Sequence, residues 1–238
     1  GCQAFFGYPI TPQSEIPEYF SRELPPRGGL FLQAESEMAA MNMVMGASAA
    51  GGRVMTSTSG PGFCLKLEAL AAMTLTRLPA VIVVVMRSGP AFGTMKAAQE
   101  DYRMCGNGGY RVVTMAPSDV QEAASMVYEA FDIADQYRNP VVILADGMIG
   151  QMMGAVDFDR MPPRRENLPA KDWALRGSDA RGGKAQAILF PVGTAHYIEK
   201  NIAETELYPA LIANETRVES IGVEDADIVL AAYGTASR

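Results

Sequence analysis

The sequence is poor in the residues that build metal clusters and two-histidine active sites. Its 238 residues include 1 histidine, 1 tryptophan and 3 cysteines, and the cysteines (Cys2, Cys64, Cys105) lie far apart with no CxxC pair. Four-thiolate zinc sites, iron–sulfur sites and a disulfide framework are therefore excluded within this chain, as are catalytic schemes that need two histidines. Scattered cysteines of odd number are the usage expected of a protein in the reducing cytoplasm.

Long apolar runs and basic clusters are also missing. The longest strongly apolar run covers 79–86, which is too short to cross a bilayer, and no signal peptide opens the chain. Asp plus Glu (27) outnumber Lys plus Arg (20), so the formal net charge is -7. This acidic balance argues against nucleic acid and anionic membrane surfaces as partners. With 48% hydrophobic and 20% charged residues, the chain has the composition of a globular protein with ample material for a core.

Short apolar segments alternate with helical segments over residues 1–155. Strands are expected at 4–8, 30–34, 53–58, 80–86, 111–115 and 140–145, and helices at 14–24, 37–50, 63–76 and 118–137. The run 80–86 is continuously apolar and β-branched, which is typical of a buried parallel strand. The alternation predicts an α/β domain built on an open parallel sheet with helices on both faces.

Residues 156–225 break this alternation. Pro162-Pro163-Arg164-Arg165 and Gly182-Gly183 interrupt any period, so we expect a long extended connection with one helix near 197–214. A further strand is expected at 228–233. Because a strand without a successor is an unfinished unit, residues 226–238 are interpreted as the start of another domain and the chain as part of a longer one.

A glycine-rich turn, Thr58-Ser59-Gly60-Pro61-Gly62, joins an expected strand to an expected helix. Glycines at such a turn let a ligand or another backbone approach closely, and a helix N-terminus attracts negative charge. The turn is neither a GxGxxG nor a Walker A loop. Its residues alone leave two interpretations open, a ligand-binding turn and an ordinary tight turn.

Glu37 and Thr11 stand at two other junctions between strands and helices. Ser36 suits an N-cap and Glu37 the first turn of a helix, although Glu37 could instead be a carboxylate held beside a cofactor ring. Thr11 before Pro12 is likewise either an N-cap and N1 pair or a site residue. Asp146-Gly147 lacks the preceding glycine and a suitably placed asparagine of a Mg²⁺-diphosphate motif. We therefore expect no metal site in this chain.

Four stretches are more specific together than separately. They are GYPITP at 7–12, ESEMAA at 35–40, TSTSGPGF at 56–63 and NPVVILADG at 139–147. Together they resemble the α subunit of 2-oxoacid:ferredoxin oxidoreductases, in the region that forms the thiamine diphosphate pyrimidine-binding domain. QMM at 151–153, LPAKDWA at 168–174 and NETR at 214–217 look most like the branched-chain subtype, which acts on 2-oxoisovalerate (3-methyl-2-oxobutanoate).

This resemblance implies a domain organisation. Residues 1–155 would form the pyrimidine-binding domain and 156–225 the extended connection. Residues 226–238 would begin a domain similar to the C-terminal domain of transketolase.

The resemblance also implies an activity and roles for individual residues. The activity is oxidative decarboxylation of a 2-oxoacid to an acyl-CoA, with electrons passed to ferredoxin. Glu37 matches the carboxylate that hydrogen-bonds N1′ of the cofactor and favours its reactive imino tautomer, while Thr11 and Arg87 match positions near the substrate. An arginine pairs well with the carboxylate of a 2-oxoacid. The implied cofactor-binding residues are Tyr8, Pro9, Glu37, Ser59, Gly60 and Pro61.

The parts that this chain lacks imply partner subunits. A β subunit would carry the diphosphate and Mg²⁺ site, and γ and ferredoxin-like δ subunits would carry iron–sulfur clusters. The stretch CGNGGY at 105–110 departs from the Gly-Gly-His-Gly-Asp-like stretch usual in the family, whereas 87–94 keeps Arg87 and a Gly-Pro…Gly frame. Two alternatives stay open: a non-catalytic pyrimidine-binding fold that serves assembly, and an enzyme specific for 2-oxoglutarate or pyruvate.

Overall fold

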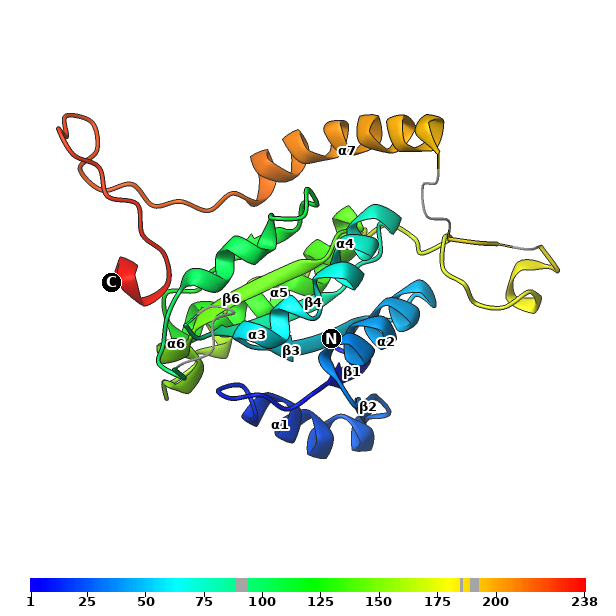
Figure 1. Cartoon of the computed structure of the whole chain (residues 1–238), viewed down its shortest axis with the longest axis horizontal. Coiled ribbons are helices and arrows are strands. Elements are labelled where there is room, and N and C mark those ends of the chain that lie inside the picture. The colour runs from blue at the N-terminus through cyan, green and yellow to red at the C-terminus, as the bar shows by residue number, and fades with distance from the viewer. Residues whose placement is uncertain (89–93, 185, 189–192) are drawn as a thin grey trace.

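A parallel sheet forms the centre of the molecule (Figure 1). The computed structural model describes residues 1–88, 94–184, 186–188 and 193–238. Its strands pair in the order β2-β1-β3-β4-β6-β5, and every pairing is parallel. They are β1 (Ala4–Gly7), β2 (Leu30–Gln33), β3 (Val54–Thr58), β4 (Val81–Met86), β5 (Val113–Met115) and β6 (Val141–Asp146). The predicted open parallel sheet is confirmed.

The helices follow the expected order with two differences. The α-helices are α1 (Glu15–Glu23), α2 (Glu37–Ala49), α3 (Gly60–Cys64), α4 (Leu67–Thr76), α5 (Val120–Tyr137), α6 (Gly147–Gln151) and α7 (Thr194–Glu215). Short 3₁₀ turns are η1 (Pro25–Arg27), η2 (Glu100–Cys105), η3 (Phe158–Arg160), η4 (Asp179–Arg181) and η5 (Gly234–Ser237). The helix expected at 63–76 is divided into α3 and α4, and α6 was not predicted.

Both faces of the sheet are apolar and both are covered. Along β4, Ile82, Val84 and Met86 belong to one buried cluster, while Val81, Val83 and Val85 belong to the other. The first cluster includes residues of α2 and α4, and the second includes residues of α5 with part of α1 beside it. Burial on both faces explains why β4 reads as a continuous apolar run.

The order of the strands marks a place at their carboxyl ends, called the crevice below, where open α/β sheets bind ligands. From β1 the chain adds β2 on one side and then β3 on the other, so the direction of winding reverses between β1 and β3. In open α/β sheets, ligands bind outside the carboxyl ends of the strands at such a reversal. The glycine-rich turn follows β3, and Glu37 opens the helix after β2.

The extended connection packs at the other end of the sheet, beside the amino ends of the strands. Leu175 N–H donates to the carbonyl of Ala49 at the end of α2, at 2.8 Å. The side chains of Arg53 and Lys171 bind the buried Asp135 on α5 at 2.8 Å and 2.7 Å. Helix α7 then runs along the outside of the domain, at the top of Figure 1. The connection is therefore anchored to the domain through charged groups on α5.

The strand expected at 228–233 is wrong. No strand is assigned there, and Ile228 and Leu230 are 80% and 90% exposed. A strand needs a neighbour for its backbone hydrogen bonds, and this segment passes outside the sheet before it reaches η5 (Figure 1). The divisions at 1–155, 156–225 and 226–238 stay predictions. Among the described residues, no helix has the length and apolar character needed to cross a bilayer.

Candidate functional site

The start of α2 separates two neighbouring glutamates. The Ser36 hydroxyl accepts a hydrogen bond from Ala39 N–H at 3.2 Å, which confirms Ser36 as the N-cap. Glu37 is the first residue of the helix and only 6% of it is exposed, whereas Glu35 is exposed. The cap thus turns the carboxylate of Glu37 inward and leaves that of Glu35 in solvent.

The glycine-rich turn forms the first turn of α3 and faces Glu37. A Cβ atom added to Gly62 would lie 2.6 Å from Oε1 of Glu37 and 2.5 Å from Oγ1 of Thr58. Both distances are shorter than real Cβ contacts, so any larger residue at position 62 would force these two side chains to move. The glycine-rich turn and the opening of α2 therefore approach each other closely at the carboxyl edge.

Several buried polar atoms at this edge have no protein partner. Thr58 Oγ1, Ser59 Oγ and Asp101 Oδ1 are buried without a hydrogen bond in the described structure. The carboxylate of Glu37 likewise has no recorded hydrogen bond to another described residue. Buried polar groups are normally satisfied, and leaving them unpaired is costly. The cluster is suited to a polar ligand that enters the crevice and satisfies these groups.

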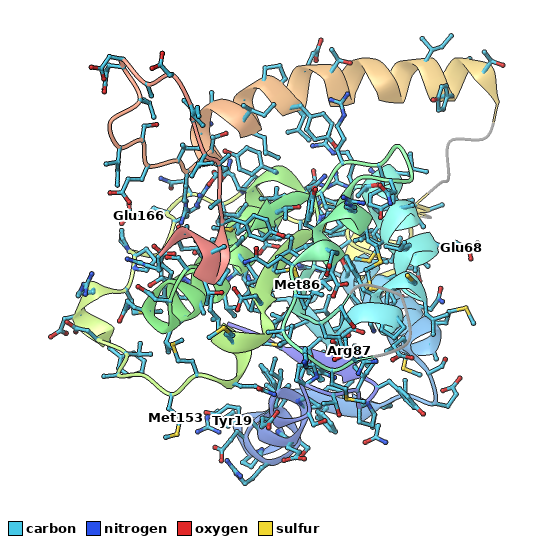
Figure 2. All side chains as sticks on the ribbon, turned by 60° about the vertical axis from the view of Figure 1, so that its left-hand side comes forward. Tyr19, Glu68, Met86, Arg87, Met153 and Glu166 are labelled. Carbon is cyan, nitrogen blue, oxygen red and sulfur yellow. The ribbon has the colours of Figure 1, made fainter. Side chains whose placement is uncertain are left out.

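Arg87 and Thr11 lie together, as the sequence predicted for two residues of one site. Arg87 directly follows β4, and its Nη1 donates to the carbonyl of Thr11 at 2.8 Å. In Figure 2, Arg87 lies between the sheet and the N-terminal segment. Helix α1 starts at Glu15 with Ser14 as its N-cap, so Thr11 is not an N-cap residue. Thr11 instead lies within the loop between β1 and α1 and binds Arg87 through its carbonyl.

Asp101 links the glycine-rich turn to the end of β4, and sequence reasoning missed it. Its Oδ2 accepts hydrogen bonds from Gly60 N–H at 3.1 Å and Arg87 N–H at 3.3 Å. Asp101 is fully buried on η2, and this burial raises the pKa of its carboxyl to about 6 despite the two N–H donors. It comes from the aperiodic stretch 88–109, where no sequence signal sets it apart.

The loop after β1 is held against β3 through a glutamine. Gln13 Nε2 donates to the carbonyl of Tyr8 at 3.2 Å, and Gln13 Oε1 accepts a hydrogen bond from the hydroxyl of Ser57. Tyr8 is half-buried and Pro9 is exposed. No contact between these two residues and Glu37 is recorded among the described residues. Their predicted role at the cofactor therefore stays a prediction.

Asp146, the candidate metal ligand of the sequence, is engaged in capping a helix. The carboxylate of Asp146 caps α6 through Met148 N–H at 3.0 Å and Ile149 N–H at 3.1 Å, and its second oxygen accepts from Thr235 N–H at 2.8 Å. The described residues contain no group of three His, Cys, Asp or Glu side chains arranged for a metal ion. The Gly-Pro…Gly frame at 89–93 lies outside the described residues.

Comparisons with known proteins identify the family of this chain. Residues 1–181 match the family described as pyruvate flavodoxin/ferredoxin oxidoreductase, thiamine diP-bdg. The whole chain is 47% identical to the ketoisovalerate oxidoreductase subunit VorB of Methanothermobacter marburgensis and covers 68% of it. The 2-oxoglutarate synthase subunit KorA of Methanocaldococcus jannaschii is 45% identical over 64% of this chain and 43% of its own length.

A solved structure shares the fold. The 2-oxoglutarate:ferredoxin oxidoreductase from Magnetococcus marinus, with 2-oxoglutarate, coenzyme A and succinyl-CoA bound, matches 94% of this chain and 44% of its own. The TM-score is 0.74 at 26% sequence identity. The chain thus spans about two thirds of VorB and less than half of this solved chain.

In their chemistry, the residues at this edge fit the pyrimidine half of thiamine diphosphate. The carboxylate of Glu37 is a hydrogen-bond acceptor, and the unpaired hydroxyls of Thr58 and Ser59 can donate or accept. The resemblance of the sequence motifs to their family is confirmed by the match of residues 1–181. The chain belongs to the 2-oxoacid:ferredoxin oxidoreductase family, as a subunit that carries the thiamine diphosphate-binding domain.

Proposed function

We propose that this chain activates thiamine diphosphate in a branched-chain 2-oxoacid:ferredoxin oxidoreductase. That enzyme would convert a 2-oxoacid and coenzyme A to acyl-CoA and CO₂ and pass the electrons to ferredoxin. The observation that carries the proposal is the buried carboxylate of Glu37, which faces Gly62 without a hydrogen-bonding partner among the described residues. When bound, thiamine diphosphate supplies the carbon nucleophile and the electron sink that decarboxylation of a 2-oxoacid requires.

The residues of this chain would hold protons and orient the reactants. The carboxylate of Glu37 would accept a hydrogen bond from the protonated N1′ of the pyrimidine and keep the proton at that nitrogen. The planar guanidinium of Arg87 would pair with the carboxylate of the 2-oxoacid. Thr11, whose carbonyl holds Arg87 Nη1, would keep the guanidinium directed toward the crevice. Tyr8, Pro9, Ser59, Gly60 and Pro61 would line the cofactor.

The remaining machinery is assigned to partner subunits. A β subunit would hold the diphosphate and Mg²⁺, and γ and ferredoxin-like δ subunits would hold the iron–sulfur clusters. The relatives are named as oxidoreductase subunits, which supports an assembly of several chains. Asp146 is occupied with capping α6 and binding Thr235, which supports placing the metal elsewhere. We place the assembly in the cytoplasm.

The substrate is assigned from similarity to VorB, which extends over the whole chain. A second candidate is 2-oxoglutarate, since KorA is 45% identical over part of the chain. Hydrophobic pockets discriminate a methylene by only about 1–3 kcal/mol, so related branched 2-oxoacids should also react. The assembled enzyme should show a higher kcat/KM for 2-oxoisovalerate than for 2-oxoglutarate or pyruvate. The opposite preference would reassign the substrate without changing the reaction.

The role of Glu37 is tested by hydrogen exchange at C2 of the bound cofactor. In the assembled complex, Glu37→Gln should slow exchange of this proton for deuterium by about 10²–10⁴-fold, as expected when a positioned acid–base group is lost. Glu35→Gln is the matched control, because Glu35 is exposed two residues away, and it should exchange at the wild-type rate. Slow exchange in the Glu35 variant alone would move the role to Glu35. Normal exchange in both variants would favour a non-catalytic assembly subunit.

A further inference from the structure

One lysine is buried inside the domain with no exposed surface. Lys66 precedes α4, and its side chain is fully enclosed. Its ammonium donates hydrogen bonds to the carbonyl of Glu37 at 3.3 Å and to Thr56 Oγ1 at 3.1 Å. A buried lysine is costly, and an apolar side chain of similar length would usually serve packing alone better. The position of Lys66 therefore calls for an explanation beyond packing.

The charged group that acts on this ammonium is Glu37. Burial lowers the pKa of Lys66 to about 8, and the negative charge of Glu37 opposes that shift. The polar groups that contact the ammonium come from α2 and β3, and Glu37 is the titratable group among them. Lys66 thus touches the backbone of Glu37 and lies in the electrostatic field of its carboxylate.

We infer that Lys66 is a positioning residue for Glu37. It fixes the first turn of α2 through the Glu37 carbonyl and places a positive charge beside the carboxylate that faces the cofactor. The inference rests on the proposed function of Glu37, and it concerns a residue that makes no contact with the substrate. Without Lys66, the first turn of α2 would lose this anchor, and the carboxylate of Glu37 would be less well placed to accept the hydrogen bond of N1′.

The first test is the pH profile of C2 exchange in the assembled complex. Lys66→Met keeps the length of the side chain but removes its charge and its donors. It should slow exchange at neutral pH by about tenfold, since a small misplacement of a catalytic group is costly, and it should remove an alkaline limb near pH 8, where Lys66 of the wild type loses its charge. Thr56→Val is the control, because it removes one hydrogen bond of Lys66 and keeps the charge. Its alkaline limb should stay in place.

The second test measures cofactor affinity rather than turnover. Calorimetry with thiamine diphosphate and Mg²⁺ on the assembled complex gives Kd for wild type, Lys66→Met, Glu37→Gln and the double variant. If Lys66 acts through Glu37, the loss caused by Lys66→Met should largely disappear in the Glu37→Gln background. Equal losses in both backgrounds would show that Lys66 does not act on the carboxylate of Glu37 and would overturn the inference, as would an alkaline limb that persists in Lys66→Met.

The two proposals fail in different ways. If Glu37→Gln exchanges C2 normally, the proposed function of Glu37 is wrong. If Glu37→Gln is slow but Lys66 and Glu37 behave independently, only the role of Lys66 is wrong. Lys66→Gln provides a second variant if the methionine variant does not fold, because it retains a donor without the charge and should remove the alkaline limb as Lys66→Met does.

Discussion

Arg87 presents a planar guanidinium at the end of β4, and one of its nitrogens is already held by the carbonyl of Thr11. Lysine keeps the charge but not the fork, so Arg87→Lys should lower kcat/KM for the 2-oxoacid by about tenfold or more, mainly through KM. Steady-state kinetics of the assembled enzyme measures this. Arg217→Lys is the control, because Arg217 pairs with Glu129 on an exposed surface. Equal kinetics for the Arg87 variant and wild type would remove Arg87 from the substrate site.

Asp101 gives the protein a specific dependence of stability on pH. Its pKa is about 6 in the folded protein against an ordinary value of 3.8, so the folded state binds more protons between these values. Stability should therefore fall as pH rises from about 4 to 6, by up to roughly 3 kcal/mol from this group. Asp101→Asn should remove this component. Urea unfolding of both proteins at pH 4.5, near the lower end of this range, and at pH 7, about one unit above its upper end, checks it.

The sequence predicts the residues whose roles depend on their neighbours in the chain. It does not predict those whose roles depend on contacts with residues far away in the sequence. Ser36 and Glu37 follow a strand and open a helix, so capping rules and the family motif both point to them. Asp101 and Lys66 have no such signal. Asp101 acts on Gly60 and Arg87, 41 and 14 residues away, and Lys66 acts on Glu37, 29 residues away. Only the fold brings these groups together.

Helices α2 and α3 each contain a glycine, and replacing these two glycines by alanine should have opposite effects. Gly62→Ala would drive a methyl group into Glu37 Oε1 and Thr58 Oγ1, so it should slow C2 exchange at least about tenfold and lower the melting temperature. Gly46 lies within α2 with nothing within 4 Å of its missing Cβ. Gly46→Ala should stabilise the protein by about 0.5–1 kcal/mol without changing exchange. Thermal unfolding and C2 exchange of both variants test this pair, and normal exchange in Gly62→Ala would contradict the close approach.

Elements were predictable where their period was clear. The apolar run of β4 and the amphipathic length of α5 gave correct types, with boundaries within two residues. Helix α6 was not predicted because two of its five residues are glycines, Gly147 and Gly150, which weaken the helical pattern of the sequence. The run at 228–233 has the composition of a buried strand, but composition does not supply the neighbouring strand that pairing requires.

At the scale of the whole molecule, the site that we propose in this chain would be half of a cofactor pocket. It would offer a carboxylate and hydroxyls to a pyrimidine, while Asp146 is engaged in capping α6. The chain alone should therefore bind thiamine diphosphate weakly, with Kd well above about 1 μM, since only part of the ligand would be contacted. Calorimetry of the chain with Mg²⁺, with and without the assigned partner subunits, measures the difference. Sub-micromolar binding by the chain alone would contradict the division of the site.

The connection is anchored beside the amino ends of the strands, whereas the crevice lies at their carboxyl ends. The two ends of the sheet therefore carry separate sets of residues. Arg53 and Lys171 hold Asp135 there, and Arg164 and Arg53 hold Asp132, all at 2.7–2.9 Å. The groups that face the crevice share no residue with this ionic cluster. We therefore expect that residues 164–175 of the connection can be replaced by the corresponding segment of a relative, provided that these charges are retained. The residues of the crevice and the residues that anchor the connection can therefore change independently of each other during evolution.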